Sequence, residues 1–166
     1  ASMDALTTGI ANIAIGSSTL GASTTGCYNI AMGASALSGA VTTGIANIAI
    51  GLSTMDALTS GICNVAIGSN ALGASTTGCH NIAIGDTAIG TGVTTGNNNF
   101  AAGKNAAKAL TSGYTNIAIG PNTMDGNTTG NQNIAMGNAA MSGGAISGHS
   151  NIGLGSYNSE KLTTGC

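Results

Sequence analysis

The chain has 166 residues, of which only 5% are charged and 2% aromatic, while 28 are Gly and one is Pro. An apolar share of 42% and a net charge of −2 exclude a disordered chain, and Gly does not recur at every third position as collagen requires. Three Lys and Arg residues in total supply too little positive charge for nucleic-acid binding. No apolar run is long enough to span a bilayer. We therefore expect a single domain, residues 1–166, with no nucleic-acid partner and no membrane span.

One motif, Asn-Ile-Ala-Ile-Gly or a close variant, recurs along the whole chain. Its first residues are separated by 17, 18, 17, 17, 18, 17, 17 and 18 positions, at Asn12, Asn29, Asn47, Asn64, Asn81, Asn99, Asn116, Asn133 and Asn151. Three successive spacings add up to 52, so a three-motif super-repeat lies over the single repeat. One such unit cannot bury its own apolar side, and stacking of neighbouring units is the usual solution.

Each motif predicts a short strand, in chain order over residues 13–15, 30–32, 48–50, 65–67, 82–84, 100–102, 117–119, 134–136 and 152–154. Large and small residues alternate within each, which is the period of a strand. Gly residues on both sides predict corners that need a positive φ or a close backbone approach. We expect an all-β fold: a parallel β-solenoid of about nine coils, 17–18 residues each, forming a rod about 43 Å long.

The first and third residues of each strand are expected to point into the core, together with the residue eight places after each Asn. In the sixth strand Phe100 is large while Ala102 and Ala107 are small, which indicates a shared packed volume. The expected core includes Ile13, Ile15, Ile48, Ile50, Phe100, Ile117 and Ile119. The opposite face then carries Asn, Ala and Gly. Its Asn residues would stack as a hydrogen-bonded ladder, either filling a tight turn or leaving a flat outer face that another flat face can approach.

Leu stands six residues before the Asn in every third repeat, at Leu6, Leu58, Leu110 and Leu162. An untwisted solenoid core needs only a one-coil period. Duplication of a three-coil unit explains the longer period, and so does a neighbouring molecule that contacts the rod at every third coil. The second explanation predicts a lateral interface at these Leu residues.

The four Cys residues leave two interpretations open, disulfides or unpaired structural thiols. Cys63 and Cys79 lie in adjacent coils, the only pair within reach inside one chain, since a disulfide needs Cα atoms within about 7 Å. Cys27 and Cys166 would then be free or bonded between chains. His80 and His149 are four coils apart, about 19 Å, too far to share a metal. We expect no metal, no cofactor and no enzymatic site.

The Asn-Ile-Ala-Ile-Gly motifs, linked through Thr-Thr-Gly, resemble the head repeats of trimeric autotransporter adhesins and similar arrays in phage tail fibres and other surface fibres. The resemblance covers essentially the whole chain. It implies a left-handed parallel β-roll, exported and elongated, often a homotrimer. This chain departs from the adhesin heads in its longer coils and in showing neither a neck nor a coiled-coil stalk.

The sequence therefore favours an extracellular or virion structural fibre that associates with itself. The chain starts and stops in the middle of a repeat, which suggests a segment of a longer fibre or a stacking unit. Two alternatives stay open. One is an adhesin head or tail-fibre shaft that binds cell-surface glycans. The other is an ice-binding protein that uses the repeated Thr-Thr pairs as a ladder of hydroxyls.

Overall fold

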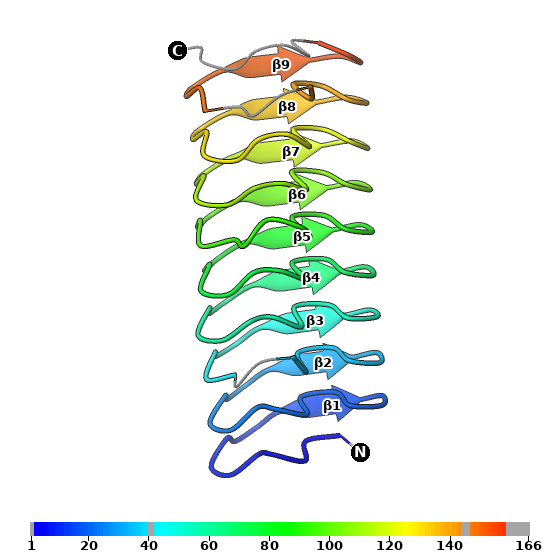
Figure 1. The fold of residues 1–166 in the computed structure, drawn as a ribbon, viewed down its shortest axis with the longest axis vertical. Helices are drawn as coiled ribbons and strands as arrows, with labels where there is room; N and C mark the ends of the chain where they lie inside the picture. Colours follow the sequence, from blue (N-terminus) through cyan, green and yellow to red (C-terminus); the bar gives the residue numbers. More distant parts are fainter. Residues whose placement is uncertain (1, 40–41, 144–146, 159–166) are drawn as a thin grey trace.

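The chain folds as a straight rod of stacked coils, which the computed structural model describes for residues 2–39, 42–143 and 147–158. Figure 1 shows the short strands stacked in sequence order, from β1 near one end of the rod to β9 near the other. The described residues contain no helix. The strands are β1 (Ile13–Ile15), β2 (Ile30–Met32), β3 (Ile48–Ile50), β4 (Val65–Ile67), β5 (Ile82–Ile84), β6 (Phe100–Ala102), β7 (Ile117–Ile119), β8 (Ile134–Met136) and β9 (Ile152–Leu154).

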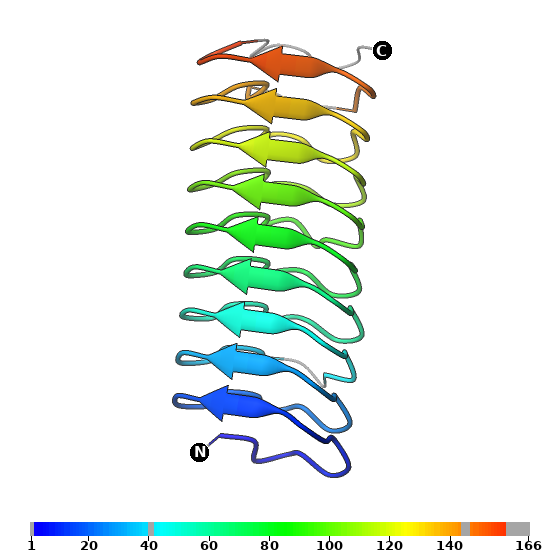
Figure 2. The ribbon, with the colours of Figure 1, turned by 180° about the vertical axis from the view of Figure 1, so that it is seen from behind.

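All nine strands form one parallel sheet in sequence order. Each strand pairs residue for residue with the next, from Ile13 opposite Ile30 at one end to Met136 opposite Leu154 at the other. The strands keep nearly the same direction along the rod, and the chain winds in a left-handed sense (Figure 2). The predicted parallel β-solenoid is confirmed, with strands at the predicted residues.

The turns outside the strands are also hydrogen-bonded from coil to coil. Leu37 N donates to Thr54 O at 3.0 Å in the coil that follows, whereas Ser53 N donates to Ala34 O at 3.0 Å in the coil that precedes. Because every described coil repeats nearly the same backbone path, polar backbone groups of the turns meet partners in the neighbouring coils. Backbone hydrogen bonds therefore join the coils in the turns as well as in the sheet.

Two Gly positions in each coil turn the chain for different reasons. The Gly that ends each Asn motif has a positive φ, as at Gly51 (φ 138°), which residues with a side chain rarely adopt. The Gly three places before each Asn is needed for close approach instead. A Cβ on Gly78 would lie 2.7 Å from Gly96 O and 2.9 Å from Asn81 Nδ2. Both kinds of predicted corner are present.

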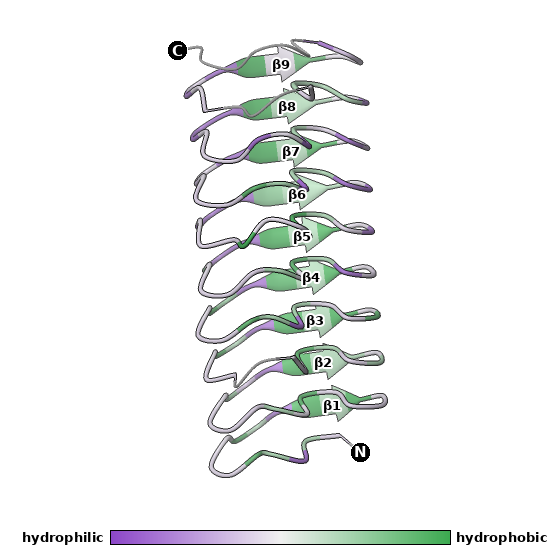
Figure 3. Cartoon of the chain, in the orientation of Figure 1, coloured by the Kyte–Doolittle hydropathy of each residue, from purple (hydrophilic) through white to green (hydrophobic). Residues whose placement is uncertain are grey.

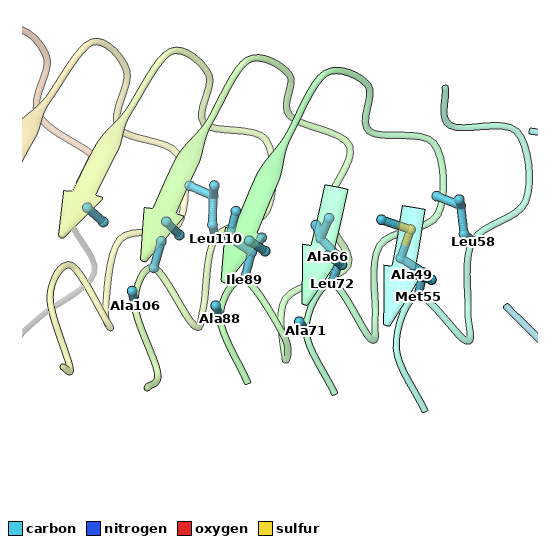
Figure 4. Packing of buried hydrophobic residues seen from close by; sticks show 14 of the residues in the cluster. Ala49, Met55, Leu58, Ala66, Ala71, Leu72, Ala88, Ile89, Ala106 and Leu110 are labelled. Carbon is cyan, nitrogen blue, oxygen red and sulfur yellow. The ribbon is translucent and has the colours of Figure 1, made fainter. Parts of the chain in front are cut away.

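The core lies between the middle residue of each strand and a turn on the opposite side of the coil. Figure 4 shows Ala49 and Ala66 of the sheet facing Met55 and Leu72 of the turns. The middle residues of β2 to β8 are buried. The residues eight places after the first eight Asn residues are buried too, as predicted: Leu20, Leu37, Met55, Leu72, Ile89, Ala107, Met124 and Met141. The ninth, Ser159, lies outside the described residues.

The prediction for the first and third strand residues was wrong, because their side chains point away from the core. Ile13 is 49% exposed and Ile15 56%, and Ile117 is also exposed. Four further residues of the predicted core are only partly buried: Ile48, Ile50, Phe100 and Ile119. The interior is narrow, so Ala fits opposite Leu or Met. Residues alternate across a strand, so placing Ala inside places Ile outside.

Core volume is still compensated, but on the inner face. Gly153 stands in β9 where the other strands have Ala, and Met141 fills the space beside it. A Cβ on Gly153 would lie 2.6 Å from Met141 Cγ. A change on one side of this thin core is thus matched directly across it.

Candidate lateral interface

The first and third residues of the nine strands form two parallel columns on the outside of the rod, which we call the outer face. The first column holds Ile13, Ile30, Ile48, Val65, Ile82, Phe100, Ile117, Ile134 and Ile152, and the second holds Ile15, Met32, Ile50, Ile67, Ile84, Ala102, Ile119, Met136 and Leu154. Figure 3 shows the strands as a hydrophobic column along the rod, beside more polar turns. The outer face is therefore a continuous apolar stripe.

A parallel sheet with one bare apolar face is unusual, because parallel sheets are normally covered on both faces. Eight steps of about 4.8 Å and strands about 10 Å long give the outer face a plan area of about 400 Å². The largest apolar patches on monomeric proteins are roughly 300–600 Å² and often mark interaction sites. Size, flatness and regular spacing make the outer face the strongest candidate site on the described chain.

Beneath the outer face, the predicted Asn ladder is present, but it lies inside the rod. In each of eight links, the backbone N–H of one Asn donates to the side-chain oxygen of the Asn one coil before, at 2.9–3.0 Å, from Asn12 to Asn151. Most of these side chains are fully buried. The expectation that Asn, Ala and Gly form a flat outer face was therefore wrong.

The Asn side-chain NH₂ group completes the network. Asn47 Nδ2 donates to Gly61 O at 2.9 Å and to Asn29 Oδ1 at 3.1 Å. No buried side-chain N or O atom in the described part of the chain lacks a hydrogen-bond partner. Burial of the Asn is costly without these partners. The ladder therefore fixes which face of each strand is turned inward, and it leaves the Ile residues outside.

The predicted lateral interface at Leu6, Leu58, Leu110 and Leu162 is wrong for the two central residues. Leu58 and Leu110 are 0% exposed and belong to the core of their own chain. Leu6 is partly buried, and Leu162 lies outside the described residues. An apolar contact to a neighbour cannot use side chains with no accessible surface.

The three-coil period is explained by hydrogen bonds inside the rod, between these Leu residues and the residues at nearby positions of the neighbouring coils. Ser23 Oγ donates to Thr42 O at 3.3 Å, and Thr42 Oγ1 donates to Leu58 O at 3.1 Å. The same chain of bonds joins Ser75, Thr94 and Leu110 in the next super-repeat. In the 18-residue coil that contains Thr94, the side chain of Val93 points outward and is 59% exposed, while Thr94 is fully buried. The super-repeat is thus a repeating interior of Ser, Thr and Leu.

The candidate disulfide between Cys63 and Cys79 is not formed, and both thiols are free. Cys63 lies directly before its Asn, whereas Cys79 lies two places before and stacks beside Ile62. Ile62 N donates to Cys79 Sγ at 3.4 Å. Cys27 is also a free thiol. Its proposed inter-chain partner, Cys166, lies outside the described residues.

The described residues hold no group of three or more His, Cys, Asp or Glu side chains that could ligate a metal ion, and they form no detectable pocket. His80 and His149 are both exposed and lie in different coils. Among the carboxylates, burial raises the pKa of Asp56 above its ordinary value of 3.8, against the lowering effect of hydrogen bonds from the Asp56 and Ala57 backbone.

No family model, curated protein or solved structure matches this chain. Within the described residues, no helix is long and apolar enough to cross a membrane.

Proposed function

We propose that this chain is a structural, non-enzymatic rod that associates side by side with copies of itself to build a fibre. The observation that carries the proposal is the outer face, a flat apolar stripe that runs the length of the described sheet. Burial of apolar surface is the main favourable term in protein association. A bare stripe of this kind gains free energy when a second apolar surface covers it.

A copy of the same chain fits this surface better than an unrelated globular partner would. Any partner must be apolar and flat over about 40 Å, with features that recur at about 4.8 Å. The outer face itself meets these conditions, and isologous contacts between identical patches are the commonest way in which soluble proteins assemble.

We further propose an extracellular or virion location for the fibre. Support comes from the resemblance of the Asn-Ile-Ala-Ile-Gly and Thr-Thr-Gly pattern to the repeats of surface adhesins and tail fibres. Glycan binding by a head or shaft of this type is part of the same proposal. On the corner before the strands, the exposed side chains of Tyr28 and Tyr114 offer flat surfaces to such a ligand.

Ice binding is the second candidate, and one feature favours it. The first hydroxyl of each Thr-Thr pair often bonds within the rod, as Thr59 Oγ1 does to Thr76 O at 3.0 Å. The second residue of the pair is exposed in coil after coil, giving one column of hydroxyls: Thr8, Thr25, Thr43, Ser60, Thr77, Thr95, Ser112 and Thr129. Thermal hysteresis in a dilute solution would support this candidate, and ordinary freezing behaviour would remove it.

Electron microscopy of the purified full chain, over a series of concentrations, tests the structural proposal. We expect rods that lie side by side or form bundles. A matched pair of variants identifies the surface. Ile84→Lys puts a charge at the centre of the outer face, and Val93→Lys puts the same charge on an exposed turn. Bundles should disappear only in Ile84→Lys; single rods at every concentration in the wild type would refute the proposal.

A further inference from the structure

Strand β6 differs from the other strands in the sizes of its two outward side chains. In the other eight strands both outward residues are large and apolar, whereas β6 has the largest apolar residue, Phe100, followed by the smallest, Ala102. Both side chains are partly exposed and neither belongs to the buried cluster. A large residue needs a small one nearby only where both lie in the same packed layer. The pairing of a large Phe100 with a small Ala102 therefore indicates that the outer face packs against another surface.

We propose that two copies of this chain pack outer face to outer face, with parallel rods and level coils, so that Phe100 of each copy covers Ala102 of the other. The proposal rests on the self-association proposed above and specifies its geometry. A two-fold axis parallel to the rod, passing over the middle Ala of each strand, places every strand opposite its own copy. The strand direction is reversed across this axis, so the first column of one copy faces the second column of the other.

The opposite orientation of the rods fits less well. A two-fold axis parallel to the strands makes the rods antiparallel and places each column against itself. With the axis at β6, Phe100 would meet its own copy and Ala102 would leave a gap beside its own copy. With the axis at the central strand β5, β6 faces β4, so Phe100 meets Val65 and Ala102 meets Ile67. Only the parallel arrangement places the largest residue of the outer face directly against the smallest at both sites.

The in-register sheet makes this contact possible along the whole rod. Phe100 pairs in register with Ile82 and Ile117 of the neighbouring strands, and Ala102 pairs with Ile84 and Ile119. The strands keep a common direction in Figure 2, so a second flat sheet can follow the first without diverging. Two faces of about 400 Å² plan area, with ridged side chains, remove on the order of 1,000 Å² from water, near the lower bound for a specific interface.

A volume swap tests the geometry. Ala102→Phe alone places two bulky rings against each other at the level of β6. It should weaken association at least tenfold, because overpacking a packed layer is destabilising and the contact occurs twice in the dimer. The double variant Phe100→Ala with Ala102→Phe exchanges the two columns at that level and keeps the pair complementary. We expect it to restore the dissociation constant to within about threefold of the wild type. Circular dichroism of each variant at high dilution checks that the rod itself is folded.

The outcomes separate the geometry from the association itself. If Ala102→Phe weakens association and the swap does not restore it, the parallel face-to-face arrangement is wrong, while self-association through the outer face stands. If the wild type stays monomeric at every concentration, both proposals fail. If the single variant associates as tightly as the wild type, Phe100 and Ala102 lie outside the interface and the inference is refuted.

A cysteine experiment gives an independent readout in the full chain with its four native Cys residues replaced by Ser. Ile82→Cys and Ile84→Cys are prepared separately, mixed at a dilution that allows exchange, and then concentrated and treated with a short thiol-reactive crosslinker. A crosslinker is needed because packed sheets lie about 10 Å apart, whereas a direct disulfide needs Cα atoms within about 7 Å. Parallel packing predicts crosslinked dimers mainly between the two variants. Dimers that form mainly within each variant alone would indicate antiparallel rods centred on β5 and would overturn the proposal.

Discussion

Asn64 N donates a hydrogen bond of 3.0 Å to Asn47 Oδ1 in the preceding coil. The same bond recurs at every step from one coil to the next. It requires the Asn to point inward, and alternation along the strand then points the neighbouring Ile outward. The buried Asn ladder thus determines that the Ile side chains point outward and make the outer face apolar.

Removal of one Asn from this ladder should destabilise the rod strongly. Asn64→Ala leaves the Gly78 carbonyl without the 2.8 Å bond and the Asn81 N–H without the 2.9 Å bond that the Asn64 side chain supplies. Two buried polar groups left without partners cost about 2–6 kcal/mol together. Urea unfolding measures the effect. The exposed Asn138→Ala serves as the control and should change the free energy of unfolding by no more than about 0.5 kcal/mol.

Ile84 and Ile89 are close in the sequence, but they should differ sharply in their contribution to the free energy of unfolding. Ile89 is fully buried and Ile84 is 40% exposed. Ile89→Ala should cost about 2–5 kcal/mol because it opens a cavity in the core. Ile84→Ala should cost less than about 1 kcal/mol in dilute monomeric solution. Equal losses in thermal unfolding would show that the assignment of inner and outer faces is wrong.

The internal explanation of the super-repeat predicts a role for one hydroxyl. Thr94 Oγ1 donates to Leu110 O at 2.9 Å in a buried site. Thr94→Val keeps the shape but leaves this carbonyl without its hydroxyl partner, at a cost of about 1–3 kcal/mol. Thr95→Val, at the exposed neighbour, is the matched control. If both variants unfold at the same urea concentration as the wild type, the bond between Thr94 and Leu110 does not support the three-coil period.

Asp56 should make the stability depend on pH. Burial raises its pKa in the folded state above the ordinary 3.8, so the folded chain binds the proton more tightly than the unfolded chain does. The stabilisation this gives is fully present below pH 3.8 and is lost as the pH rises through the folded-state pKa. Asp56→Asn should therefore be more stable than the wild type at pH 7, with an advantage that shrinks on acidification. Asp86→Asn, at an exposed carboxylate, controls for net charge.

The repeat in the sequence was sufficient to predict the parallel solenoid, the position of every strand and the stacked Asn residues. Hydrophobic alternation within the repeat was not sufficient to predict which side of each strand faces inward. Residues such as Tyr28, Leu37 and Ile89 have positive φ values of 59°, 52° and 47°, a conformation that is uncommon for large side chains. Alternation cannot be counted through such residues, so side-chain directions on one side of a coil do not follow from the other.

The outer face could have been found from one signal in the sequence. An invariant Asn beside an invariant small residue fits a narrow, hydrogen-bonded interior, whereas adjacent Ile residues need more room than one coil offers. The Leu period misled for a different reason. Buried Ser and Thr residues lie in the coils between those of Leu58 and Leu110. Hydropathy alone does not predict that such polar residues are buried, because their burial depends on hydrogen bonds.

Sedimentation velocity over a dilution series, on the wild type, Ile84→Lys and Val93→Lys, tests the central claim most directly. The outer face should make the wild type and Val93→Lys sediment as concentration-dependent oligomers, while Ile84→Lys sediments as a folded monomer throughout. A wild type that stays monomeric, or an Ile84→Lys variant that associates as the wild type does, would contradict the claim that this apolar stripe is where the rods meet.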